Sequence, residues 1–137
     1  MARTITVSGN MRIVDDEDIV ANEIERVAFN DSIDLDEDQP EDLIHVEGRA
    51  GGEVRIELDL TVQLIRNNRI RITGVAILFE GVSEETNDED GRFEFSFIVR
   101  PGRTANRHFR LRNTDEGGDY ADISFTCSNT RLHVIDL

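Results

Sequence analysis

The segment "EVRIELDLTVQL", residues 53–64, alternates polar and apolar residues without a break. Every even-numbered position holds an aliphatic side chain, and every odd-numbered position holds a polar or charged one. This period of two is typical of a β-strand with one face in a core and the other in water. The segment therefore predicts a long strand that packs one face against a hydrophobic core.

A second strand follows closely and predicts a hairpin. The intervening "RNN", residues 66–68, contains Asn67 and Asn68, which tolerate left-handed backbone angles. Pairing Leu64 with Ile70 keeps apolar residues opposite one another and leaves a three-residue loop. We therefore expect a hairpin over residues 53–79.

The apolar parity of this second strand changes at Gly74. The apolar positions are even-numbered before the glycine and odd-numbered after it: Ile70 and Ile72, then Val75, Ile77 and Phe79. One extra residue near Gly74 would restore a single apolar face, which is the effect of a β-bulge. A strand buried on both faces is the alternative, because Ala76 and Leu78 permit it. We expect the bulge.

Further strand-like segments extend to both ends of the chain, and their alternation is clearest in the second half. They are "TITVSGNMRIV" (4–14), "LIHVEG" (43–48), "RFEFSFIV" (92–99), "RHFRLRN" (107–113), "ADISFTCS" (121–128) and "RLHVIDL" (131–137). Short strands at this spacing, separated by turn residues, favour an antiparallel sandwich or barrel. We expect an all-β protein, an antiparallel β-sandwich or barrel of about 7–8 strands, with residues 1–137 forming one domain.

One segment allows two interpretations. In "DEDIVANEIERVAF", residues 16–29, Val20, Ile24 and Val27 have helical spacing after Asp18, a residue type that caps helices. The segment predicts either a short helix near residues 18–28 or an irregular strand.

The charge is strongly negative. The chain has 29 acidic and 15 basic residues, a net charge of -14, and every basic residue is arginine, so the protein is lysine-free. A GC-rich genome or adaptation to a salt-rich cytoplasm would produce this composition. A surface of this sign repels phosphates, which argues against nucleic acid and membrane surfaces as partners. Like charge also opposes tight self-association, so we expect a monomer or weak dimer.

Other features of the sequence indicate the cellular compartment and the reactivity of the single cysteine. The chain lacks the apolar run of a signal peptide and any stretch near the ~20 apolar residues of a membrane span. A soluble, cytoplasmic protein is the default expectation. Cys127 is the single cysteine and alternates with Ile123 and Phe125, which predicts a buried, unreactive thiol.

The densest acidic segment does not match a known calcium loop. In "SIDLDEDQPED", residues 32–42, a calcium loop starting at Asp34 would need glycine at position 39 and glutamate at position 45. The chain has Gln39 and His45 there. We interpret the segment as a solvated connection.

Two later loops are better placed to bind calcium. If the strands run up and down in order, "GVSEETNDEDG" (81–91) and "NTDEGGDYAD" (113–122) lie at the same end of the sandwich. Calcium takes six to eight oxygen ligands, which carboxylates and carbonyls of adjacent loops can supply. The predicted ligands are Asp88, Asp90, Asp115, Asp119 and Asp122.

Two classes of function remain. The three histidines, His45, His108 and His133, fall in no recognisable nucleophile motif. We expect a non-catalytic β-sandwich that acts as a binding or interaction module, through calcium or a protein partner. The alternative is a small carboxylate-dependent enzyme of the hydrolase class, which needs two acids at a defined separation in a cleft. A deep pocket with a desolvated carboxylate would favour the enzyme.

Overall fold

The structure is a computed structural model that describes residues 2–16, 23–81, 85–114 and 118–132. These ranges contain eight strands and one short 3-10 helix. The strands are β1 (Arg3–Asp15), β2 (Glu23–Leu35), β3 (Glu41–Ala50), β4 (Val54–Leu64), β5 (Ile70–Glu80), β6 (Glu89–Val99), β7 (Thr104–Arg112) and β8 (Tyr120–Arg131), and the helix is η1 (Arg66–Asn68). No helix in these ranges is long and apolar enough to span a membrane.

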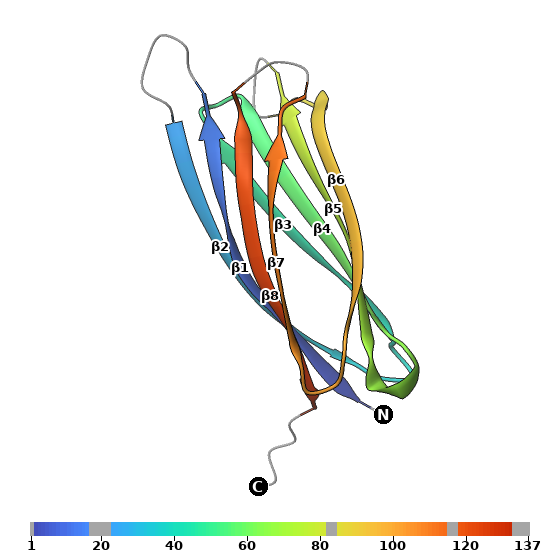
Figure 1. Cartoon of the computed structure of the whole chain (residues 1–137). Coiled ribbons are helices and arrows are strands. Elements are labelled where there is room, and N and C mark those ends of the chain that lie inside the picture. The colour runs from blue at the N-terminus through green and yellow to red at the C-terminus, as the bar shows by residue number, and fades with distance from the viewer. Residues whose placement is uncertain (1, 17–22, 82–84, 115–117, 133–137) are drawn as a thin grey trace, which may run out of the picture.

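The strands form two four-stranded antiparallel sheets, which confirms the predicted all-β sandwich. One sheet has the order β2-β1-β8-β7 and the other the order β3-β4-β5-β6 (Figure 1). Consecutive strands within a sheet are neighbours, and the chain closes on itself where β8 pairs with β1. The sandwich is therefore an up-and-down meander that changes sheets twice, between β2 and β3 and between β6 and β7.

The core lies between the two sheets and follows the alternation of the sequence. In β4 the even-numbered aliphatic side chains from Val54 to Val62 are fully buried. Ile70, Ile72 and Leu78 of β5 are equally buried beside them, and Ile5, Val7, Met11 and Ile123 face them from the other sheet. Burial of this one face per strand explains why the alternating pattern predicts the fold.

The hairpin over residues 53–79 has the predicted register. Leu64 pairs with Ile70, and the Ile65 backbone N–H donates to the Arg69 carbonyl at 2.8 Å. Three residues remain for the turn. Asn67 and Asn68 adopt positive φ angles of 64° and 60°, as their place in the turn predicts.

The predicted bulge at Gly74 is wrong. Gly74 pairs without interruption with Leu60 on one side and Phe95 on the other, and the register shift of β5 against β6 lies at Leu78/Phe79. Gly74 is needed for another reason, because a Cβ at this position would overlap the Phe95 ring. Val75, Ile77 and Phe79 instead lie half-buried on the outer face, where the Arg55 guanidinium covers the Phe79 ring at 4.4 Å.

The helix considered for residues 18–28 is also wrong over its described part. Residues 23–28 belong to β2, which pairs with β1 at every position from Glu23 to Leu35. Val27, Phe29 and Ile33 alternate toward the core, and this burial outweighs the weak helical spacing. Residues 17–22 lie outside the described part of the chain.

The described loop residues lie at two ends of the sandwich, as the meander predicts. At one end, the buried Asn129 amide donates to the carbonyls of Asn68 and Val99 at 2.8 and 2.9 Å, joining the β4–β5 turn to the end of β6. At the other end, the Thr114 N–H donates to the Asp90 carbonyl at 2.7 Å, so the segment after β7 contacts the start of β6.

Candidate metal centre

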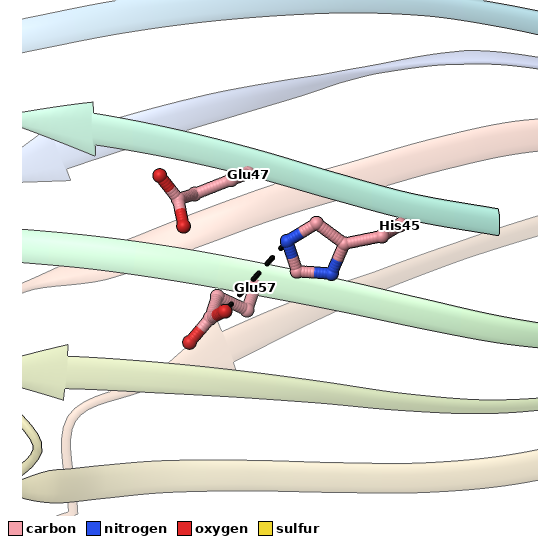
Figure 2. Close-up of side chains that lie close together, drawn as sticks. All are labelled: His45, Glu47 and Glu57. Atoms are coloured by element: carbon pink, nitrogen blue, oxygen red, sulfur yellow. Dashed lines mark ion pairs between the residues drawn. The ribbon is translucent and has the colours of Figure 1, made fainter.

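A histidine and two glutamates converge on the outer face of the β3-β4-β5-β6 sheet. His45 and Glu47 are alternate residues of β3, so their side chains share the outward face. The β3–β4 register places Glu47 opposite Glu57 and His45 opposite Asp59. One ligand atom from each of His45, Glu47 and Glu57 lies within 4.8 Å of the others (Figure 2).

Asp59 fixes the orientation of the imidazole. Its Oδ1 lies 2.5 Å from His45 Nδ1, while His45 Nε2 lies 3.7 Å from Glu57 Oε1. The hydrogen bond to Asp59 raises the pKa of His45, and the charges of Asp59, Glu57 and Glu47 act in the same direction against desolvation. With the Nδ1 proton donated to Asp59, the neutral ring presents Nε2 as its lone-pair nitrogen. This is the arrangement in which carboxylates support metal-binding histidines.

Two arginines balance the directly opposed glutamates. Arg49 Nη2 lies 3.1 Å from Glu47 Oε2, and Arg55 Nε donates to Glu57 Oε2 at 3.4 Å. Like charges opposite one another destabilise a sheet, so these contacts offset part of the repulsion. Each arginine contacts Oε2 of its glutamate. For Glu57 the other oxygen, Oε1, is the one that faces the imidazole.

The cluster lies on an open surface. The side chains of His45, Glu47 and Glu57 are 49%, 36% and 24% exposed. Asp59 also borders a shallow groove of about 560 Å³ on the same face, lined further by Thr61, Thr73, Val75, Glu94 and Ser96. An ion held here would be reachable by water and by a docking molecule.

The acids predicted to bind calcium are dispersed over several environments. Asp90 and Asp119 are buried, and Asp119 Oδ1 accepts the Asp16 N–H at 2.8 Å. The Asp122 carboxylate accepts Arg110 Nε and Nη2 at 2.7 and 3.0 Å on the outer face of the other sheet, and this contact lowers the pKa of Asp122. Asp88 is exposed in the loop before β6.

Calcium binding by this set stays a prediction, because Asp115 lies outside the described residues. Within the ranges that the structure describes, His45, Glu47 and Glu57 are the one group of three side chains close enough to share an ion. The sequence analysis missed this group. The available signal was the pair of alternating triplets "HVE" (45–47) and "ELD" (57–59) on neighbouring strands.

Cys127 and His108 lie on opposite faces of their sheet. Cys127 is buried on the inner face, and burial raises its pKa to about 12. His108 is exposed on the outer face, where its Nδ1 lies 2.5 Å from Ser124 Oγ. These two residues cannot form a catalytic pair, and His133 lies outside the described residues.

Comparisons with known proteins assign no family. No protein family model matches the chain, and curated proteins give no significant match to its sequence. The function must therefore be inferred from the geometry of the site.

Proposed function

We propose that this protein is a metal-dependent binding module that holds one divalent transition-metal cation, with zinc the best fit. The ligands are His45 Nε2 and one carboxylate oxygen each from Glu47 and Glu57. The observation that carries the proposal is the convergence of these three side chains, with Asp59 orienting the imidazole.

The donor set and its spacing favour zinc. Zinc binds histidine nitrogen and carboxylate oxygen at about 2.0–2.2 Å in tetrahedral geometry, which sets neighbouring donor atoms roughly 3.4 Å apart. His45 Nε2 and Glu57 Oε1 lie 3.7 Å apart, so a small side-chain rotation brings them to that spacing. Calcium prefers six to eight oxygens, and an imidazole ligand selects against it.

Binding would also relieve electrostatic strain in the sheet. Glu47 and Glu57 are opposed across the β3–β4 ladder, and Asp59 adds a third carboxylate beside His45. A divalent cation bound among these carboxylates would offset their mutual repulsion. The chain should therefore become more stable when the ion binds, by mass action on the folded state.

An open coordination position supports a role in binding. Three protein ligands leave one tetrahedral position for water or for a donor atom of another molecule. The cluster lies on an exposed sheet face beside the groove at Asp59, where a partner can approach. We infer that the ion attaches a carboxylate-bearing or imidazole-bearing partner to this face.

Calorimetry with zinc, manganese and calcium on tag-free protein tests the proposal. We expect one zinc ion per chain and weaker manganese binding. The affinity for zinc should fall by at least about tenfold in His45→Ala and in Glu57→Gln. His108→Ala is the matched control, because His108 is an exposed histidine on the other sheet. Absence of zinc binding, or equal zinc affinity in all three variants, would refute the site.

A further inference from the structure

The β2-β1-β8-β7 sheet ends in two regular edge strands, β2 and β7, each paired along one side only. β2 pairs with β1 over residues 23–35, and β7 pairs with β8 over residues 104–112, both without a register shift. In the described ranges, neither strand makes a backbone hydrogen bond across its outer edge. Such edges are templates for a further strand unless they are blunted.

The charges of these two edges are complementary. β2 carries four acids and one arginine, a net charge of -3: Glu23, Glu25, Asp31, Asp34 and Arg26. β7 carries three arginines and no acid, a net charge of +3 with His108 neutral: Arg107, Arg110 and Arg112. In a chain of net charge -14, β7 is thus a localised basic edge.

The edges of the other sheet do not match in this way. β3 and β6 each carry three acids and one arginine, so both edges are -2 and repel one another. β6 also contains the register shift near Asp90, and Pro40 directly precedes β3. Irregularity, proline and like charge are the devices that prevent edge pairing.

Apolar side chains accompany both complementary edges. Beside β7, the Phe93 side chain is 42% exposed and packs on Phe109 with ring centroids 4.6 Å apart. On β2, Val27 and Phe29 face inward but stay half-buried at the edge of the sandwich. Joining the two edges would remove this apolar surface from water.

We propose that a second copy of this chain pairs its β2 edge with the β7 edge of the first, so that one sheet continues from molecule to molecule. The nine residues of β7 would provide a ladder of roughly 30 Å. The contact is head-to-tail, because it joins two different edges, and each added molecule presents a new β2 or β7 edge. Repulsion between chains of net charge -14 keeps the contact weak at low salt.

Sedimentation velocity of paired charge-reversal variants tests this contact at about 0.15 M salt. Glu25→Arg with Asp31→Arg converts the β2 edge to +1, and Arg107→Glu with Arg112→Glu converts the β7 edge to -1. We expect the wild-type mass to rise with protein concentration and each variant to stay monomeric. A one-to-one mixture of the two variants should associate again, because it contains one wild-type edge of each kind.

Control variants separate edge pairing from net charge. Asp38→Arg with Glu41→Arg makes the same charge change as the β2 variant, and Arg71→Glu with Arg100→Glu matches the β7 variant; all four residues are exposed and lie outside β2 and β7. Both controls should associate like wild type, and circular dichroism should show that every variant is folded. A wild-type protein that is monomeric up to about 1 mM would overturn the proposal. So would failure of the mixture to associate, or equal loss of association in the controls.

Discussion

Replacement of Gly74 by alanine should destabilise the protein through the Phe95 ring. The new Cβ would overlap the far end of this ring, which also packs against Phe93, Phe97, Phe109 and Phe125. Overpacking of this kind costs about 1–3 kcal/mol of unfolding free energy, and the loss of glycine flexibility in the unfolded chain returns about 0.4–1 kcal/mol. We expect a net loss of roughly 1–2 kcal/mol, with a melting temperature lower by a few degrees.

A double-mutant cycle measured by urea unfolding identifies the cause. Phe95→Leu alone creates a cavity and should be destabilising, but in the Gly74→Ala background it removes the overlap. The two changes should therefore be coupled by about 1 kcal/mol or more, with the double variant more stable than the sum of the single effects predicts. Strict additivity would show that Gly74 acts through the backbone, as a bulge would require, and would refute the ring explanation.

Three further predictions concern the core and the loop end. Replacing the buried Asn129 by alanine removes the amide donor to the Asn68 and Val99 carbonyls and the acceptor of Arg3 Nε. Urea unfolding should then show a free energy of unfolding lower by roughly 3 kcal/mol. A decrease below about 1 kcal/mol would contradict this. Burial raises the Cys127 pKa to about 12, so at pH 8 the thiol is protonated and should react with a thiol reagent only as fast as the protein unfolds; rapid labelling of the native protein would contradict this. Calcium at about 1–10 mM should raise the melting temperature, and Asp88→Asn should reduce that rise; absence of both heat and thermal stabilisation would rule out calcium binding at the loop end.

Much of the fold follows from alternation, because each strand buries one face. The period of two in residues 53–64 identifies β4, and the asparagines of the turn fix its register with β5. The pattern misled where apolar residues lie on the outer face. After Gly74, the outward residues of β5 are partly covered by neighbours such as Arg55, so they need no bulge to bring them into the core.

β2 was hard to assign for a related physical reason. It is an edge strand whose side chains are mostly exposed, so few of its positions must be apolar. The chance helical spacing of Val20, Ile24 and Val27 therefore left a helix and a strand equally compatible with the sequence. Edge strands carry the weakest sequence signal, because few of their side chains contact the core and must therefore be apolar.

The candidate metal centre depends on a register that the strand patterns alone do not determine. His45 and Glu47 meet Glu57 and Asp59 because Ala50 pairs with Val54 across a three-residue turn. Gly51 and Gly52 adopt positive φ angles of 64° and 75° in that turn, conformations that glycine accepts without strain. A slip of two residues would keep every side chain on its own face, yet it would move Glu47 away from Glu57, to a position opposite Arg55 or Asp59. The two glycines therefore help to set the geometry of the candidate metal centre through the register, although neither glycine contributes a side chain to it.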